Sequence, residues 1–201
     1  MRFFISLLFL PFILTSCSLA PFAPSQTGTS LGAGQASAEF GSANSTYYLG
    51  AQAGISTNFD MGYIMQFGGD FSTSAITGKY SFANNKTGPA LALEGGYGSS
   101  DASSFYYLGA VASLAFNESF ELFINARGNK VSTDDSEIDI GDSTGAMTVN
   151  AEELTYLLGT VGFNVWATPT LGLSIYGQQA WGEDIEWNDG LAMGAGLLMK
   201  L

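Results

Sequence analysis

The chain has 201 residues, of which 18 are acidic, six are basic and none is histidine, so its formal net charge is −12. This balance excludes nucleic-acid binding, which needs a surface rich in Lys and Arg to displace counterions. Only 12% of the residues are charged and 26 are glycine, whereas soluble domains carry about 25% charged residues. Something other than water is therefore expected to cover much of the surface.

The first sixteen residues have the pattern of an export signal. Met1-Arg2 precede an apolar run from Phe3 to Leu14, which is too short to span a bilayer as a helix but is typical of a signal-peptide core. The run ends in Leu14-Thr15-Ser16-Cys17, which resembles the bacterial lipobox. The resemblance implies that residues 1–16 are removed and that Cys17, the only cysteine, becomes the acylated N-terminus. The alternative is an ordinary secretory signal with a cysteine near the cleavage site.

Residues 17–30 are predicted to be the lipidated cysteine and a flexible tether. The stretch from Ser18 to Ser30 contains two prolines and many small polar residues, and it spans at most about 45 Å when fully extended. Ser18 follows the cysteine where Asp would favour retention in the inner membrane. By resemblance to enterobacterial sorting rules, we therefore expect lipid-anchored export to the outer membrane of a Gram-negative bacterium, with palmitate or a similar acyl chain on Cys17.

From Leu31 to Leu201 the apolar residues recur with period two, which indicates strands with two different faces. In the last segment, Leu191, Met193, Ala195 and Leu197 share one face. We expect an all-β domain over residues 31–201: a closed antiparallel up-and-down barrel of about ten strands, with eight left open. The expected strands are 31–40, 46–56, 59–71, 74–83, 88–98, 105–116, 119–130, 153–166, 170–181 and 190–201.

The lengths of the connections predict an orientation. They are short around Asn58, Asn117 and Pro169, whereas Val131–Glu152 and Gly182–Asp189 are longer and acidic. Membrane barrels of the bacterial outer membrane have short periplasmic turns and longer extracellular loops. An even number of strands then places both termini on the periplasmic side, where a lipid on Cys17 can enter the inner leaflet.

The composition of the second face indicates which side meets the membrane. It consists mostly of Gly, Ala, Ser, Thr and Gln, with few charges, so it suits a crowded barrel interior better than bulk water. Lys79, Glu94, Glu121 and Arg127 are the predicted interior charges, and we expect Lys79 and Arg127 to pair with the two glutamates. The apolar face would then contact lipid. The alternative is a soluble cup with its apolar face inward.

Aromatic residues near the strand ends predict two interfacial belts. The extracellular belt would hold Tyr47, Tyr48, Tyr97, Tyr106, Tyr107, Tyr156 and Trp181. The periplasmic belt would hold Phe59, Phe82, Phe116, Phe120 and Trp166.

The C-terminal segment Gly196–Leu201 resembles the terminal strand signal of the outer-membrane β-barrel (porin-like) superfamily. Gly196, Met199 and Leu201 fit the pattern, although the family usually ends in an aromatic residue where this chain has Leu201. The resemblance implies a membrane barrel whose partners are outer-membrane lipid, lipopolysaccharide and the barrel-assembly machinery.

Little in the sequence points to catalysis. The absence of histidine excludes Ser–His hydrolysis and removes the commonest transition-metal ligand. Glu94 and Glu121 could act as an acid–base pair, but a structural ion-pair role is favoured. We therefore expect no enzyme and no cofactor other than the covalent lipid.

The acidic loops suggest one binding hypothesis. Five carboxylates lie within nine residues in one loop, and a second group follows near the C-terminus. Alternating carboxylates could bind Ca²⁺, which prefers oxygen ligands, and could bridge lipopolysaccharide phosphates. The alternative is a solvated loop that discourages aggregation. The residues concerned are Asp134, Asp135, Glu137, Asp139 and Asp142, then Asp184, Glu186, Asn188 and Asp189.

These observations lead to three functional predictions. The first is a non-enzymatic outer-membrane barrel lipoprotein with a structural or surface-interaction role through its acidic loops. The second is a narrow passive pore for small solutes, because small residues on the inner face leave space. The third is a soluble, lipid-anchored periplasmic barrel that binds an apolar ligand.

Overall fold

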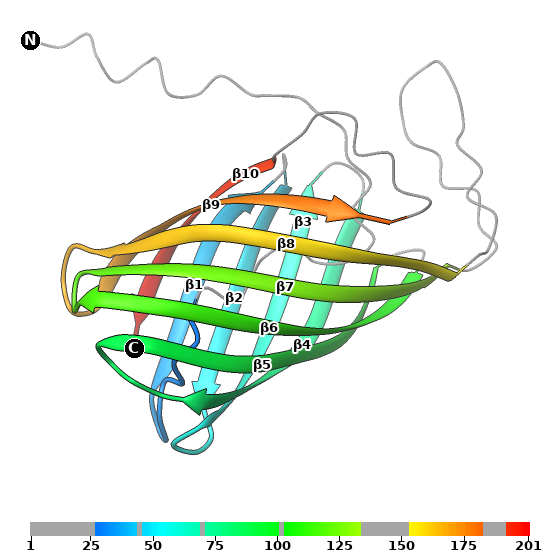
Figure 1. The fold of residues 1–201 in the computed structure, drawn as a ribbon. Coiled ribbons are helices and arrows are strands. Elements are labelled where there is room, and N and C mark those ends of the chain that lie inside the picture. Colours follow the sequence, from blue (N-terminus) through cyan, green and yellow to red (C-terminus); the bar gives the residue numbers. More distant parts are fainter. Residues whose placement is uncertain (1–26, 44–45, 69–70, 101–102, 134–152, 183–191) are drawn as a thin grey trace, which may run out of the picture.

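The computed structural model describes residues 27–43, 46–68, 71–100, 103–133, 153–182 and 192–201. Ten antiparallel strands form one closed barrel in which each strand pairs with its neighbours in sequence and β1 pairs with β10 (Figure 1). Among the described residues there is no helix long and apolar enough to cross a membrane. The strands are β1 (Ala36–Ala43), β2 (Thr46–Gly54), β3 (Phe59–Gly68), β4 (Phe71–Ala83), β5 (Gly88–Ser100), β6 (Ser103–Asn117), β7 (Phe120–Thr133), β8 (Glu153–Trp166), β9 (Leu171–Trp181) and β10 (Ala192–Lys200).

The all-β, ten-stranded barrel expected from the sequence is confirmed, and most strand boundaries differ by only a few residues. The first strand is an exception because it begins at Ala36 and not at Leu31. Gly32 and Gly34 have φ values of +89° and +77°, which belong to the left-handed region and are incompatible with a regular strand. The residues before Ala36 therefore take another course.

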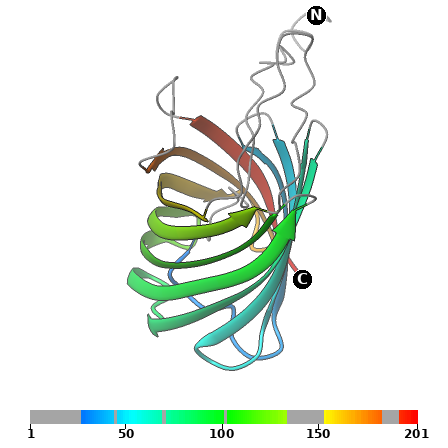
Figure 2. The ribbon, with the colours of Figure 1, turned by 90° about the vertical axis from the view of Figure 1, so that its right-hand side faces the viewer.

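Closure of the sheet depends on the pairing of β1 with β10. Phe40 lies opposite Leu197 and Gly41 lies opposite Gly196, and the same two residues of β1 face Leu49 and Tyr48 on β2. The barrel viewed from a second side shows the strands tilted around one lumen (Figure 2). A closed sheet leaves no strand edge with unpaired backbone groups, as a hydrocarbon environment requires.

The two ends of the barrel differ in their connections. At one end, called here the short-turn end, the connections are residues 55–58, 84–87, 118–119 and 167–170, and the last residue of the chain lies there too. At the opposite end, the loop end, three connections contain only two residues each, and the other two are residues 134–152 and 182–191. The predicted difference in loop length therefore holds for two loop-end connections and is wrong for the other three.

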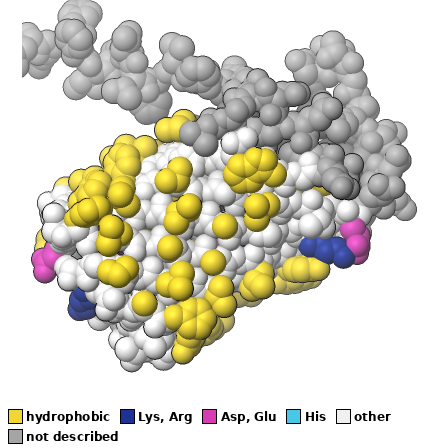
Figure 3. Space-filling model, in the orientation of Figure 1, with side chains coloured by type: hydrophobic (Ala, Val, Ile, Leu, Met, Phe, Trp, Pro, Cys, Tyr) yellow, Lys and Arg dark blue, Asp and Glu magenta, His cyan; other side chains and the backbone are white. Residues whose placement is uncertain are grey.

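Most of the large aliphatic residues of the strands point outward, and most of the charged residues of the strands point into the lumen. Leu122, Leu173 and Leu197 are 41%, 46% and 41% exposed, whereas Lys79 and Glu121 are 2% and 9% exposed. The space-filling view shows hydrophobic side chains spread over the wall, with charged groups toward its two ends (Figure 3). This orientation is opposite to that of a soluble cup with an apolar interior.

Glycines on the lumen side make room for aromatic rings. A Cβ on Gly96 would lie 2.4 Å from the ring of Tyr107, and one on Gly194 would lie 2.3 Å from the ring of Tyr176. Each ring lies flat over a strand position that has no side chain, so a narrow barrel can hold several rings at one level. This packing gives a physical reason for part of the high glycine content.

The prediction of two aromatic belts is confirmed only in part. Tyr47, Tyr97, Tyr106 and Trp181 lie on the outer face near the loop end and are half-exposed or more. Four residues assigned to the belts belong instead to the lumen side of their strands. These are Tyr48, Tyr107, Tyr156 and Trp166.

Candidate functional site: the barrel lumen

A buried ion pair lies at the middle of the lumen. Arg127 on β7 and Glu94 on β5, both predicted as interior charges, have a guanidinium-to-carboxylate distance of 3.2 Å. The Nδ2 of Asn125 donates to the same carboxylate oxygen at 2.7 Å, and the guanidinium lies 4.1 Å from the centroid of the Tyr107 ring. The charge of Arg127 is thus held by a carboxylate and by an aromatic face.

A second polar contact lies on the opposite wall. The hydroxyl of Tyr48 on β2 donates to Oε1 of Glu39 on β1, and both Tyr48 and Tyr176 on β9 are almost completely buried. The rings of Tyr48, Tyr107 and Tyr176, together with the Arg127–Glu94 pair, fill the lumen at this level.

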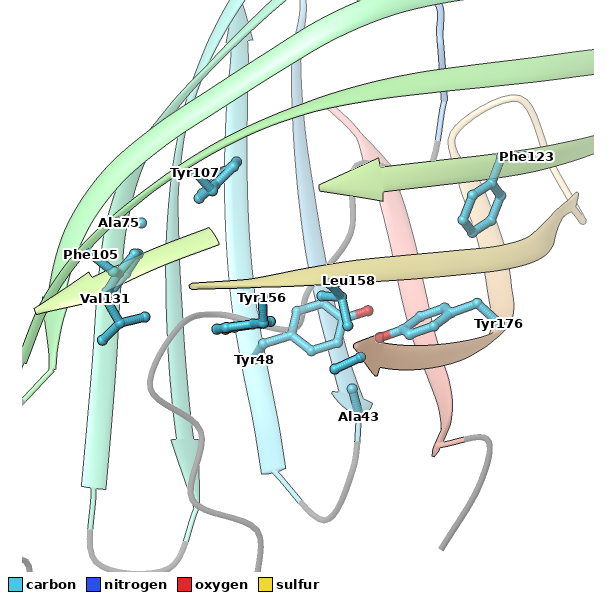
Figure 4. Packing of buried hydrophobic residues seen from close by; sticks show 11 residues of the cluster. Ala43, Tyr48, Ala75, Phe105, Tyr107, Phe123, Val131, Tyr156, Leu158 and Tyr176 are labelled. Atoms are coloured by element: carbon cyan, nitrogen blue, oxygen red, sulfur yellow. The ribbon is translucent and has the colours of Figure 1, made fainter. Parts of the chain in front are cut away.

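Toward the loop end the filling becomes apolar. Figure 4 shows rings and aliphatic side chains from several strands meeting inside the barrel. The cluster consists of Ala43, Tyr48, Ala75, Phe105, Tyr107, Phe123, Val131, Tyr156, Leu158, Tyr176 and Ala180. Phe123 lies opposite Ser113, nearer the short-turn end. The other side chains of the cluster occupy the loop-end half of the lumen in the way that side chains fill small barrels with solid interiors.

The short-turn half of the lumen contains a segment of main chain. Residues 27–35, called here the strap, run across the lumen before the chain enters β1. The Oγ1 of Thr27 donates to Glu121 on β7 at 2.7 Å, and the backbone N–H of Gly28 donates to Oγ of Ser113 on β6 at 2.9 Å. Residues 27–30 were predicted to be the end of a flexible tether. In the structure, side chains of the barrel bind these four residues, so the part of the chain that contacts the barrel begins at Thr27 or earlier.

Lys79 on β4 joins the strap to the barrel wall. Its Nζ donates to the carbonyl oxygens of Thr27 and Thr29 at 3.3 and 2.7 Å and lies 3.3 Å from Oδ2 of Asp60 on β3. Asp60 in turn accepts from the hydroxyl of Ser30 at 2.6 Å. The expected pairing of Lys79 with a glutamate was wrong, because its ion-pair partner is Asp60.

Glu121, the remaining predicted interior charge, lies on β7 and binds the same strap residue as Lys79, Thr27. Its Oε1 accepts from Thr27 and its Oε2 accepts from Nδ2 of Asn164 at 3.3 Å. Glu94 accepts from Asn125 and Arg127, whereas Glu121 accepts from Thr27 and Asn164.

Beside the strap lies a cavity of about 810 Å³ at the short-turn end, within the size range of small-molecule sites. Its wall combines strap residues with polar side chains from both the N-terminal and the C-terminal strands. At its rim, Nζ of Lys200 lies 3.8 Å from the centroid of the Trp166 ring. The polar wall includes Glu39, Gln52, Thr77, Glu121, Asn164 and Lys200.

Several predicted site residues lie outside the described residues. These are Cys17 and the acidic loop residues Asp135, Glu137, Asp139 and Asp142, together with the second acidic group. Within the part of the chain that the structure describes, no group of three or more Cys, His, Asp or Glu residues is placed to hold a metal ion.

Sequence reasoning missed the strap and the role of Asp60. A signal for the second was available: Asp60 and Lys79 are directly opposite each other in the β3–β4 pairing, and the short connection at residues 69–70 fixes that register. No comparable signal identified the strap, because a Gly-, Ser- and Thr-rich segment is equally typical of a linker.

No protein-family model matches the chain, and no curated protein matches it. Among solved structures, the chain is similar to the N-terminal β-barrel domain of Pseudomonas aeruginosa OprF, with 9% identity, a TM-score of 0.38 and coverage of 83% of this chain and 96% of that one. It is also similar to the KdgM porin, with 5% identity, a TM-score of 0.46 and coverage of 82% and 98%. A de novo designed transmembrane β-barrel matches with 12% identity, a TM-score of 0.37 and coverage of 89% and 100%.

Proposed function

We propose that the chain is a non-enzymatic, lipid-anchored barrel of the bacterial outer membrane that acts as a closed anchor for its loop-end segments. The observation that carries this proposal is the outer wall. Ile76, Ile124, Val161 and Met193, one on each of four strands, are between 58% and 62% exposed. Large apolar side chains exposed on so many strands are unfavourable in water and are typical of a wall that contacts lipid.

The distribution of charge on that wall supports the same environment. Among the described strand residues, the outward-facing charged side chains are Lys130 and Glu153, which form a pair 2.5 Å apart at the loop end. The strands contain between 8 and 15 residues, comparable to the 9–11 residues with which tilted strands cross a bilayer. A band free of charge between two charged ends matches the profile of a hydrocarbon layer.

The filled lumen favours a closed anchor over a passive pore. Tyr48, Tyr107, Arg127 and Tyr176 are each 3% exposed or less, and they cross the lumen from different walls. We therefore expect the purified protein to give no conductance steps in a planar bilayer. Regular single-channel steps that disappear when the barrel is unfolded would favour the pore function instead.

A lipid-facing wall can be tested by one pair of substitutions. Ile124 lies in the middle of β7 and Ile55 lies in a short turn, and they are 58% and 57% exposed. If lipid surrounds the wall, Ile124→Arg should lower the free energy of unfolding in bilayers by about 2–4 kcal/mol, because the charge enters hydrocarbon. Ile55→Arg should change it far less. Equal, small effects at both positions would indicate water around the wall and overturn the membrane assignment.

The lipid anchor and the surface role complete the proposal. Acylation of Cys17 predicts that growth with labelled palmitate labels the protein and that Cys17→Ala abolishes the label. The acidic loop segments at residues 134–152 and 182–191 would then lie on the cell surface, where they can meet a partner or Ca²⁺. Calorimetric titration with Ca²⁺ that gives neither heat nor stabilisation would remove the cation hypothesis and leave the anchor unaffected.

A further inference from the structure

The strap is bound mainly through its main chain, as a receptor binds a peptide. Lys79 donates to two of its carbonyls, and the N–H groups of Gly28, Ser30 and Leu31 donate to Ser113, Asn84 and Asp60 respectively. The three distances from the strap N–H groups to these acceptors lie between 2.9 and 3.2 Å. Side chains from three strands and one connection of the barrel thus bind the backbone of one short segment.

The site also selects for side-chain size and for hydroxyl groups. A Cβ on Gly28 would lie 2.8 Å from the backbone carbon and oxygen of Ala90, and backbone atoms on β5 cannot move aside as a flexible side chain can. The hydroxyls of Thr27 and Ser30 donate to the carboxylates of Glu121 and Asp60. The preferred sequence is therefore a hydroxyl residue, then glycine, then further small hydroxyl residues.

The receptor is larger than the segment that occupies it. Thr27, Thr29, Ser30 and Leu31 form only one part of the wall of the 810 Å³ cavity, which continues past the strap toward Gln52. Because the strap is covalently continuous with β1, its high effective concentration keeps a competing peptide out.

We propose that the short-turn end of the lumen is a peptide-binding site that the strap fills in cis. The same site accepts a short peptide rich in Gly, Ser and Thr in trans when the strap is absent or displaced. The ammonium group of Lys79 and the side-chain oxygens of Asp60, Ser113 and Asn84 recognise the peptide backbone. Gly28 marks the position where only glycine fits. A partner that inserts such a segment would dock at the short-turn end of the barrel, where Leu201 lies.

The test uses a fluorescein-labelled synthetic peptide with the sequence of residues 25–32 and the full chain folded in detergent micelles. Fluorescence anisotropy is compared for the natural chain and for a chain lacking residues 27–31. The strap-deleted chain should bind the peptide at least about tenfold more tightly, because the in-cis competitor is gone. A peptide with valine in place of Gly28 should bind about tenfold more weakly than the natural peptide, because overpacking against Ala90 opposes entry.

Gly28→Val in the full chain is the second variant, since it should displace the strap without shortening the chain. Ala33→Val is its matched control, because Ala33 is exposed and its substitution should leave the strap bound and the peptide excluded. Lys79→Met in the strap-deleted chain should abolish the gain in binding.

Three results would overturn the proposal. The first is a strap-deleted chain that shows the heat-dependent gel mobility of a folded barrel but does not bind the peptide. The second is equal binding by the natural and strap-deleted chains, which would place the peptide elsewhere. The third applies if neither variant folds and refolding is repeated with the peptide present. Rescue of the folded form then supports the site, and failure of rescue overturns the proposal.

Discussion

The two halves of the lumen are filled in different ways. The loop-end half is packed by side chains, with Tyr107 and Tyr176 lying over glycines and Arg127 paired with Glu94. The short-turn half is filled by main chain, because the strap binds Lys79 and Asp60 through its backbone and leaves a cavity beside it. Both halves bury an ion pair, but only the first half forms a continuous packed layer. The contrast fits a loop-end half that seals the barrel and, under the peptide-site proposal, a short-turn half that exchanges the segment it holds.

The largest expected effect comes from the central ion pair. Arg127→Met leaves Glu94 buried without its counter-charge and should lower the free energy of unfolding by about 3–5 kcal/mol. Urea unfolding in lipid vesicles measures the change. Lys130→Met, three residues along the same strand but on the outer face, is the matched control and should have little effect. The double variant Arg127→Met with Glu94→Leu should recover much of the loss, and an unchanged loss would argue against pairing as its cause.

The second-largest effect is expected at Lys79, and it tests whether the two halves of the lumen are stabilised independently. Lys79→Met removes one partner of a buried pair and the donor to two strap carbonyls, so we expect a loss of about 2–3 kcal/mol. Hydrogen exchange at the amides of Gly28 and Ser30 should accelerate in this variant but stay slow in Arg127→Met. Acceleration of both amides by Arg127→Met would mean that the halves are coupled and that the comparison fails.

Ring packing over glycine gives a smaller effect. Gly96→Ala puts a methyl group 2.4 Å from the Tyr107 ring and should cost about 1–2 kcal/mol through overpacking. Gly128→Ala is the control, since the nearest atom to its Cβ is 3.8 Å away. Thermal unfolding followed by gel mobility compares the two variants, and equal melting temperatures would show that the ring shifts without cost.

The smallest effect is expected at the rim of the cavity. Lys200→Met removes the cation from the face of Trp166, which should destabilise the barrel by about 0.5–1 kcal/mol. The intrinsic fluorescence of Trp166 should also change, whereas that of Trp181 on the outer face should not. Single-tryptophan variants distinguish these signals, and an unchanged Trp166 spectrum would indicate that Lys200 does not contact the ring in solution.

Alternation along the chain was enough to predict the strands and the faces of most residues. The rows that include Leu122, Leu173 and Leu197 point outward because a strand has only two sides, so fixing the direction of one residue fixes the whole row. Barrel closure follows because ten such rows with a lipid-like outer face leave no other way to satisfy the backbone.

Contacts across the lumen could not be predicted in the same way. Period two places Lys79, Asp60 and Glu121 on the inner side, but it does not say which of them meet across a narrow interior. It also says nothing of a segment without alternation, so the sequence pattern does not distinguish the strap from a linker. The position of Trp166 near a strand end predicts a belt residue. However, the even-numbered residues of β8, such as Asn164, face the lumen, and Trp166 belongs to the same row.

The position of the strap in the chain sets an order of events during folding. Thr27 binds a residue 94 positions later and Gly28 binds one 85 positions later, so neither bond can form until β6 and β7 are in place. Contacts between residues so distant in sequence form slowly, because a long loop must close first. Although the strap precedes every strand, its binding to the lumen is therefore expected to be one of the last steps in barrel assembly.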